Sequence, residues 1–263
     1  MIKILTGFSE KGGSTTAFIN LTNFFNEKDI DCTLYGPHNW HLNKCKSGLI
    51  QQAYINPEDI VIAHFLPIKR KPNAKKVILS CHEKNLYEVG LVKQFWDTAI
   101  FLNEKHRTYH SKYTGDFKII PNLKQNNLIV KEKSPNLEKV AGVIGSIDRN
   151  KQTHISIQRA LDDGCENVLV YGTINDQDYY NKDVKTVINN PKVTHIHFCE
   201  DKQKMYDSVG CVYHSSISEC ACLVKDECYQ TNTKFFGNEA TSSEVSSLTN
   251  EETFQLWKNL LEI

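Results

Sequence analysis

The chain has 263 residues, 40% of them hydrophobic and 24% charged, which is typical of a globular protein of one large or two small domains and excludes a low-complexity chain. No apolar run approaches the roughly 20 residues of a membrane-spanning helix, and the first strand-like segment with its polar sequel is not typical of a signal peptide. Nine scattered cysteines, an odd number, predict reduced thiols in a cytoplasm rather than a disulfide framework.

The two halves of the sequence carry opposite net charges. Residues 1–139 have 20 basic and 13 acidic side chains, a net charge of +7, whereas residues 140–263 have 11 and 18, a net charge of −7. Such a split often marks one half that binds a polyanion, but two domains that attract each other would show the same split. Both interpretations stay open.

The first half alternates strand-like and helix-like segments. Short β-branched and apolar runs predict strands at 2–8, 31–35, 60–65, 77–81, 98–102 and 117–120. Apolar residues at helical spacing predict a helix over 14–28, with Ser14, Thr15 or Thr16 as its cap. The strand-like runs are continuous rather than alternating, as expected for parallel strands buried on both faces, so we expect a doubly wound α/β domain.

A proline- and asparagine-rich segment, 121–139, interrupts this alternation and predicts a domain boundary. After it, strands are expected at 140–147, 167–173, 192–198 and 210–216, and helices at 153–163 and 202–209. We therefore expect two Rossmann-like domains, 1–135 and 136–263, that face each other across a cleft holding the active site. A last helix near 251–262, with three apolar side chains on one face, could pack against either domain.

A glycine-rich turn follows the first expected strand. Segment 7–14 nearly matches the phosphate loop of nucleoside triphosphatases, G-x-x-x-x-G-K-[ST], but Gly13 stands where that loop needs its lysine, so a triphosphatase is disfavoured. The turn could still offer backbone N–H groups to a phosphate or hydroxyl at a helix N-terminus, or could need glycine only for a positive φ angle. The sequence leaves both possibilities open.

Two glutamates, Glu219 and Glu227, are spaced as Glu-x7-Glu after an expected strand. The first is expected in a loop and the second in a helix, where each carboxylate could accept hydrogen bonds from sugar or ribose hydroxyls, worth about 1.5–3 kcal/mol each. Arg149 and Lys151 precede another expected helix, and two cations at such a place suit a diphosphate. Taken singly, the glutamates are more typical of a solvated face and the cations could form a basic surface turn.

The order of these motifs along residues 2–240 resembles the GT-B glycosyltransferases, in particular the retaining, family 4-like group with the Glu-x7-Glu motif. The matching segments in chain order are Gly12-Gly13-Ser14, His82-Glu83, the turn in AIFLNEKHRTYHSKY, Ile120-Pro121-Asn122 and IGSIDRNK, which ends at Lys151. Two departures stand out. Ser146 replaces the family's usual arginine, and CYQTNTKFFGNE replaces a small glycine-rich turn after the second glutamate.

The resemblance implies transfer of a sugar from a UDP- or GDP-sugar to an acceptor hydroxyl, with retention and without a metal or other cofactor. The second domain would bind the donor, with Glu227 on the ribose and Glu219 on the sugar. The leaving diphosphate would be neutralised by Arg149 and Lys151. The implied catalytic residues are His82, Arg149, Lys151 and Glu219. The implied donor-binding residues are Gly12, Gly13, Ser14, Gly145, Arg149, Lys151, Glu219, Leu223, Val224 and Glu227.

The expected acceptor is a polyanion, because the loop 67–76 is strongly basic and His106, Arg107, His110 and Lys112 would extend a basic surface on the first domain. The expected acceptor contacts are Lys69, Arg70, Lys71, His82 and Arg107. Hydroxymethylated bases of phage DNA, flipped into the cleft in the host cytoplasm, are the leading hypothesis. A cell-surface glycan, a lipid-linked acceptor or a non-catalytic nucleotide-binding module are the alternatives, and the two departures from the family pattern favour the module.

Overall fold

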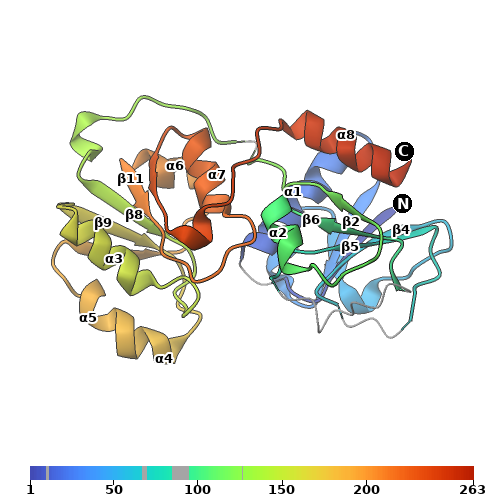
Figure 1. The fold of residues 1–263 in the computed structure, drawn as a ribbon, viewed down its shortest axis with the longest axis horizontal. Coiled ribbons are helices and arrows are strands. Elements are labelled where there is room, and N and C mark those ends of the chain that lie inside the picture. Colours follow the sequence, from blue (N-terminus) through green and yellow to red (C-terminus); the bar gives the residue numbers. More distant parts are fainter. Residues whose placement is uncertain (10–11, 67–69, 85–94, 126) are drawn as a thin grey trace. The chain divides into compact units, whose positions relative to one another are not determined.

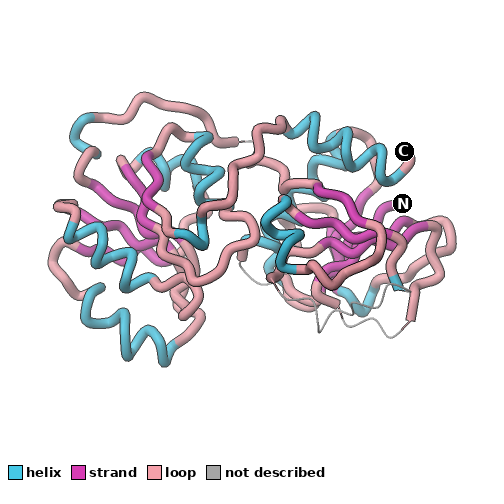
Figure 2. The backbone as a smooth tube through the Cα atoms, in the orientation of Figure 1, coloured by secondary structure: helices cyan, strands magenta, loops and turns pink. Residues whose placement is uncertain are grey.

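The computed structural model describes residues 1–9, 12–66, 70–84, 95–125 and 127–263. Contacts divide the chain into two compact units, which we call unit 1 (1–124 with 247–263) and unit 2 (125–246). Each is an α/β unit built on one parallel sheet (Figures 1 and 2), so the predicted fold class is confirmed for each unit by itself. That the two domains face each other across a cleft stays a prediction.

Unit 1 is built on a seven-stranded sheet in the order β3-β2-β1-β4-β5-β6-β7, with every neighbouring pair parallel. Its strands are β1 Ile2–Thr6, β2 Cys32–Gly36, β3 Ser47–Leu49, β4 Ile60–His64, β5 Lys76–Ser80, β6 Thr98–Phe101 and β7 Phe117–Ile119. The central strands β1 and β4 are buried along their whole length, which explains their continuous apolar sequence. β1 is shorter than expected because the chain turns at Gly7, where a Cβ would lie 1.8 Å from the carbonyl oxygen of Phe65.

In the described part of unit 1 the helices are α1 Gly13–Glu27, α2 Glu104–Tyr109 and α8 Asn250–Leu261, with short 3-10 segments at Asn39–His41 and Ile50–Gln52. The last helix, α8, belongs to unit 1 although it ends the chain. Phe254 packs edge-on against Phe24 with ring centroids 5.4 Å apart, and Trp257 packs against Phe25 at 6.0 Å. The sequence left the partner of this helix open, and its aromatic face settles it.

Unit 2 is built on a five-stranded parallel sheet in the order β10-β9-β8-β11-β12. Its strands are β8 Val140–Ile144, β9 Asn167–Tyr171, β10 Val193–His197, β11 Cys211–Tyr213 and β12 Lys234–Phe236. Its helices are α3 Thr153–Asp162, α4 Gln177–Tyr179, α5 Lys185–Ile188, α6 Lys202–Asp207 and α7 Leu223–Gln230, with a π-helical turn at Tyr180–Val184 and 3-10 turns at Pro135–Leu137 and Glu239–Thr241. No helix in the described part of the chain is long and apolar enough to cross a membrane.

The limits of the units differ from the expected division at 135/136. The connecting segment joins unit 2 from residue 125 onward because it packs there: Leu128 is buried in the apolar core of unit 2. Lys133 Nζ donates to the carbonyl oxygen of Tyr206 at 2.6 Å, and Ile129 N donates to Gln203 Oε1 at 2.8 Å. The contacts of α8 with α1 return residues 247–263 to unit 1.

Candidate active site

Part of the predicted site lies in unit 2, where two parallel strands end side by side. Because β8 and β11 are neighbours in the sheet, the loops that follow them leave from the same edge. Asn150 joins the two loops. Its backbone oxygen accepts from Ile217 N at 2.7 Å, and its side-chain amide donates to the carbonyl oxygen of Ser218 at 3.1 Å. The two loops therefore form one surface, which we call the donor edge (residues 145–151 and 214–219).

Lys151 and Glu219 form a close ion pair in the donor edge. Lys151 Nζ donates to Glu219 Oε1 at 2.5 Å, and the Glu219 side chain is only 10% exposed. Burial acts to raise the pKa of Glu219, but the hydrogen bond from His214 and the charge of Lys151 outweigh it and lower the pKa to about 2. Burial likewise acts to lower the pKa of Lys151, but the charge of Glu219 outweighs it and the pKa is raised. Both groups are therefore charged at neutral pH.

His214 is a residue of this site that the sequence analysis missed, because it fell inside the expected strand 210–216. β11 ends at Tyr213, so His214 begins the loop, and it is buried with its Nε2 3.0 Å from Glu219 Oε1. Since Glu219 is ionised, the imidazole N–H donates to it. Ser216 Oγ lies 2.9 Å from the same nitrogen. A titratable residue at the carboxyl end of a buried strand was the signal that could have identified it.

Gly145 and Asp148 set the course of the loop that carries Lys151. Gly145 has φ +142°, a region that favours glycine, at the point where the chain leaves β8. Asp148 accepts from Lys151 N at 2.9 Å and from Ser146 Oγ at 2.5 Å. Ser146, which stands in place of the family's arginine, thus helps to hold the turn. A direct contact of Gly145 with the donor stays a prediction.

Arg149 does not join Lys151 and Glu219. Its side chain is 60% exposed, and its Nε donates at 2.9 Å to Asp176 Oδ2, which lies just before α4. Asp176 also accepts from Tyr179 N at 2.9 Å and so caps that helix. The predicted action of Arg149 on a diphosphate would require it to leave Asp176, and it stays a prediction.

Glu227 lies in α7, as expected, but it is buried and already paired. Its Oε1 accepts from Lys202 Nζ, and its Oε2 accepts from the Tyr206 hydroxyl at 2.7 Å. Both partners come from α6. A ribose diol at Glu227 would have to share or displace the ammonium group of Lys202, a residue that the sequence analysis did not connect with the site. Leu223 is half-buried, Val224 packs toward the core of unit 2, and their contact with a donor stays a prediction.

The glycine-rich turn in unit 1 leads into α1, as expected, but no side chain caps the helix in the predicted way. Gly12 is the N-cap with φ −179°, which is extended backbone, so the alternative that it is needed for a positive φ is wrong. Thr16 Oγ1 donates back to the Gly12 carbonyl oxygen at 2.9 Å, and the first helical residues are Gly13 and Ser14. The buried hydroxyl of Thr15 has no hydrogen-bond partner among the described residues.

His82 and Glu83 lie at the carboxyl end of β5, as expected. Burial lowers the pKa of His82 to about 3, with a smaller contribution from His64, so His82 is neutral at physiological pH. Its ring packs against Phe18 with centroids 4.7 Å apart. Glu83 Oε1 lies 2.7 Å from His64 Nε2, and His64 Nδ1 lies 2.8 Å from the Thr6 hydroxyl. His64 is completely buried and was not among the predicted residues.

Two further histidines correct the expected basic surface. His106 and His110 are buried, and the Nε2 of each lies 2.9 Å from the backbone oxygen of Glu83. Leu102 N donates to His106 Nδ1 at 3.2 Å, so Nε2 carries the ring proton and the imidazole is neutral. Burial lowers the pKa of His106 to about 4 and also lowers that of His110. These residues contribute buried hydrogen bonds, not surface charge.

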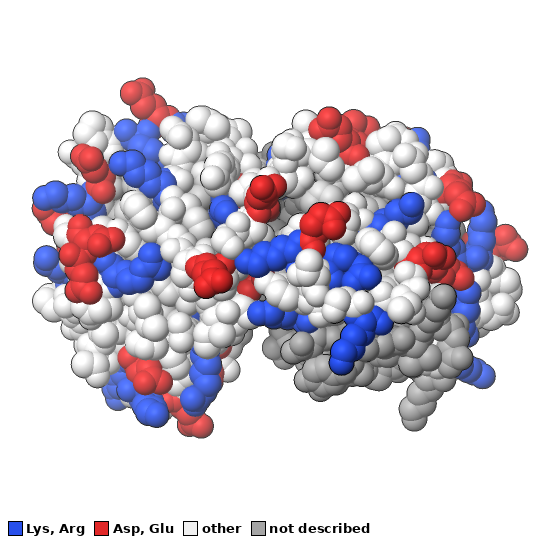
Figure 3. All heavy atoms as spheres, in the orientation of Figure 1, with Lys and Arg blue, Asp and Glu red and all other residues white. Residues whose placement is uncertain are grey.

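Of the predicted acceptor contacts, Lys69 lies outside the described residues and Arg70 is exposed. Lys71 forms an ion pair with Asp97. Arg107 is used inside unit 1: it donates to the carbonyl oxygens of His110 at 2.6 Å and Tyr113 at 2.9 Å. Basic side chains still gather over the part of unit 1 that carries α2 (Figure 3). An acceptor contact by any of these residues stays a prediction.

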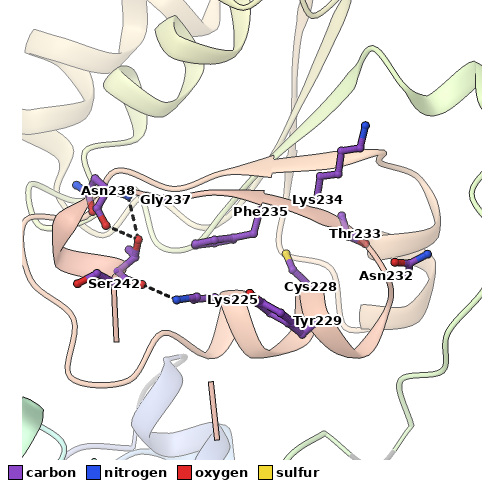
Figure 4. A pocket seen from close by; sticks show the side chains of 11 residues that line it. Lys225, Cys228, Tyr229, Asn232, Thr233, Lys234, Phe235, Gly237, Asn238 and Ser242 are labelled. Atoms are coloured by element: carbon purple, nitrogen blue, oxygen red, sulfur yellow. Dashed lines mark hydrogen bonds between the residues drawn. The ribbon is translucent and has the colours of Figure 1, made fainter. Parts of the chain in front are cut away.

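A separate cavity of about 470 Å³ lies on another side of α7 (Figure 4). Cys228 and Phe235 line it from α7 and β12, and Lys225 donates across it to the carbonyl oxygens of Thr241 at 3.2 Å and Ser243 at 2.8 Å. None of the predicted site residues of unit 2 lines this cavity. The predicted donor residues are therefore not those of this cavity.

Among the described residues, one group has the donor atoms of a metal site. One ligand atom each from His214, Glu219 and Cys222 lies within 4.8 Å of the others. The expected absence of a metal stays a prediction, and Cys220, the other cysteine of this segment, is not part of the group.

The class of fold can be assigned from solved structures, although no relative is found by sequence. No protein-family model matches the sequence, and no curated protein sequence matches it. Solved structures do match in fold, and they confirm the GT-B class of two parallel α/β sheets.

Three of these structures are similar over nearly the whole chain. Anabaena HepE in complex with UDP-glucose has a TM-score of 0.70 and 14% identity, covering 99% of this chain and 88% of its own. S. aureus TarM, as a variant in complex with fondaparinux, alpha-GlcNAc-glycerol and UDP, has a TM-score of 0.69 and 11% identity, covering 100% and 92%. WaaG, a glycosyltransferase involved in lipopolysaccharide biosynthesis, has a TM-score of 0.66 and 11% identity, covering 100% and 91%. At these identities the similarity establishes the fold alone.

Proposed function

We propose that the protein is a glycosyltransferase that moves a sugar from a nucleotide-sugar, with a UDP-sugar as the first candidate, to an acceptor hydroxyl. The observation that carries the proposal is the half-buried Lys151–Glu219 pair with His214 at the carboxyl edge of the unit 2 sheet. UDP-glucose, as the ligand of a structure with this fold, supports the choice of donor.

The chemistry of the donor edge suits this reaction. As the bond from the anomeric carbon to the phosphate oxygen breaks, negative charge develops on the leaving diphosphate, and the Lys151 ammonium would stabilise it. Glu219 is ionised, and its Oε2 has no hydrogen bond to a described residue, so it can accept from a sugar hydroxyl. For retention, the acceptor oxygen would attack the same face and give its proton to the leaving phosphate, so no protein nucleophile is needed.

A thermal-shift screen with UDP- and GDP-sugars tests the proposal. A donor that binds only the folded protein raises the melting temperature by mass action. We expect the shift in the unaltered protein and its loss in Glu219→Gln. Glu166→Gln, which removes the exposed Lys139–Glu166 pair of the same unit, is the matched control and should keep the shift. Absence of a shift with every donor, or an equal shift in Glu219→Gln, would contradict the proposal.

A nucleotide-binding module without transfer activity is the second candidate. The observation that favours it is the pairing of Glu227 by Lys202 and Tyr206, which leaves neither carboxylate oxygen without a partner. Such a module would bind a UDP-sugar but release no UDP from it. Slow release of UDP by donor hydrolysis, lost in Lys151→Met, would exclude the module.

For the acceptor we propose a polyanion, with hydroxymethylated bases of phage DNA as the first candidate. Its support is the charge of unit 1, which has 18 basic and 14 acidic residues. Binding to DNA would weaken steeply as salt concentration rises. Titration of hydroxymethylated and plain duplexes at two salt concentrations tests this. Binding that does not depend on salt, or binding only to vesicles of an anionic phospholipid, would replace DNA by another acceptor.

A further inference from the structure

The loop between β11 and α7 brings together three different donor atoms. The ligand atoms of His214, Glu219 and Cys222 lie within 4.8 Å of one another. All three side chains are largely withdrawn from solvent, with 3% and 4% exposure for His214 and Cys222 and 10% for the Glu219 side chain. The three residues come from one short segment, 214–222, whose course is fixed by the bonds to Asn150.

An imidazole nitrogen, a carboxylate oxygen and a thiol sulfur are the ligand types of zinc and cobalt sites, whereas magnesium and calcium prefer oxygen alone. Ser216 Oγ lies 2.9 Å from the His214 nitrogen, so a hydroxyl or a water molecule can complete four ligands. We propose that His214, Glu219 and Cys222 form a binding site for a thiophilic divalent cation that competes with Lys151 for Glu219. On binding, the Cys222 thiol gives its proton to solvent and the metal–sulfur bond forms, while the proton on the His214 nitrogen that faces Glu219 moves through solvent to the other ring nitrogen, so that the imidazole binds as a neutral ligand.

The competition follows from the geometry of Glu219. Lys151 Nζ and His214 Nε2 both lie against the same oxygen, Oε1, at 2.5 and 3.0 Å. A divalent cation on this carboxylate would repel the ammonium group at close range, in surroundings where the repulsion is weakly screened. We therefore expect Lys151 to turn away from Oε1 when the metal is bound, so that the metal complex weakens the ion pair.

The metal site itself goes beyond the proposed function. One consequence of it, the effect of the metal on donor binding, rests on the proposed function. If Lys151 neutralises the diphosphate of the donor, then a bound zinc ion displaces the cation that the donor needs. Zinc would therefore inhibit donor binding, and magnesium would not. Cys222 has no role in the proposed transfer, so the chain offers a variant that separates the two properties.

Cobalt titration tests the metal site without any assay of activity. A cobalt–thiolate bond gives a charge-transfer absorption band, which we expect to saturate at one equivalent in the unaltered protein and to disappear on adding zinc but not magnesium. Cys222→Ser should lose the band, with Cys222→Ala as a second variant. Cys220→Ser is the matched control and should keep it. A missing band in the unaltered protein, a band that persists in both Cys222 variants, or its loss in Cys220→Ser would overturn the proposal.

A second titration measures UDP binding with and without zinc. We expect zinc to weaken UDP binding at least tenfold in the unaltered protein and to have no effect in Cys222→Ser. Equal weakening in both proteins would overturn the competition. If UDP does not bind at all while the cobalt band is present, the proposed function fails and the metal site stands.

Discussion

The carboxyl edges of the two sheets hold their polar side chains by different means. In unit 2, buried carboxylates face ammonium groups, with Glu219 against Lys151 and Glu227 against Lys202. In unit 1, Glu83 at the corresponding edge lies among buried imidazoles, and burial lowers the pKa values of His82, His106 and His110. At an edge with ion pairs, an ammonium group or a carboxylate can leave its partner and bind an anionic or hydroxylated ligand instead. Burial acts to raise the pKa of Glu83, but the hydrogen bond from His64 lowers it, so this edge holds a carboxylate among imidazoles and offers an anionic ligand no paired ammonium group there.

In the proposed transfer, the two units would therefore contribute in different ways. Electrostatic stabilisation of a diphosphate needs a cation that is already in place, and Lys151 at the donor edge of unit 2 is such a cation. The edge of unit 1 offers imidazoles and the carboxylate of Glu83, which suit the orientation of a neutral hydrogen-bond donor such as a hydroxyl. The following changes test how separate the two units are.

The largest expected effect comes from Trp257→Ala in α8. Trp257 is 4% exposed and packs on Phe25, so its removal should lower the free energy of unfolding of unit 1 by about 3–5 kcal/mol. Unit 2 should keep its stability. Hydrogen exchange measured segment by segment reports the stability of unit 1 through β1 and that of unit 2 through β8. Leu256→Ala on the exposed side of the same helix is the control and should cost far less. Equal loss of protection in both units would contradict the separation.

Lys151→Met should act on the other unit. It leaves the buried carboxylate of Glu219 without its cation, and we expect a loss of about 2 kcal/mol, below the range for fully buried pairs because Lys151 is 25% exposed. Faster hydrogen exchange in β8 and β11, with β1 unchanged, would support this. The double variant Lys151→Met with Glu219→Gln should recover part of the loss. A single variant as stable as the original protein would show that the pair is solvated.

Acid should weaken unit 1 before unit 2. The pKa of His106 is about 4 in the folded protein against an ordinary 6.5, so the unfolded chain binds more protons between these values and stability is lost as pH falls from 6.5 to 4. The pKa of Glu219 is about 2 against 4.5, so its contribution is lost only as pH falls from 4.5 to 2.

The sequence supplies a probe for this order of events. All three tryptophans, Trp40, Trp96 and Trp257, belong to unit 1, so their fluorescence reports that unit alone. We expect the urea concentration at the fluorescence midpoint to decrease as the pH is lowered from 6.5. The protection of β8 against hydrogen exchange should persist to lower pH. In His106→Gln, the urea midpoint measured by fluorescence should depend less on pH between 6.5 and 4. Loss of protection in β8 at the same or higher pH would refute the order.

The smallest effect on stability is expected for Gly13→Val. Gly13 is exposed in the first turn of α1, so the free energy of unfolding of unit 1 should change by no more than about 0.5 kcal/mol. Binding of a UDP-sugar should nevertheless weaken several-fold, because a branched side chain covers the backbone N–H groups of the turn. Calorimetric titration measures the change in affinity. The affinity of Gly13→Ala should lie between those of the unaltered protein and Gly13→Val. Unchanged binding would remove this turn from the donor site.

Much of the fold could be predicted from the sequence, because buried parallel strands are continuous apolar runs. The strands that sequence analysis missed, β3 and β12, have three residues each and lie at sheet edges. Their sequences, Ser-Gly-Leu and Lys-Phe-Phe, carry no periodic signal, and their extended form depends on the neighbouring strand. The cap of α1 was also predicted wrongly, since Gly12 supplies no side chain.

The candidate site could be predicted where topology alone brings residues together. Lys151 and Glu219 follow neighbouring strands, so their meeting needs only the strand order. The pairing of Glu227 with Lys202 and the burial of His106 depend on how side chains far apart in sequence pack, which no local spacing reveals. The same limit hid the contacts of His64, whereas His214 was missed because the expected strand 210–216 included it.

The return of α8 to unit 1 has a consequence for the order of events during synthesis. Unit 2 is contained in one continuous stretch, whereas unit 1 needs Phe254 and Trp257 to cover Phe24 and Phe25. The ribosome makes these two residues only after the whole of unit 2. Of the two units, unit 1 is therefore begun first and completed last. Phe24 and Phe25 stay uncovered by α8 while unit 2 folds.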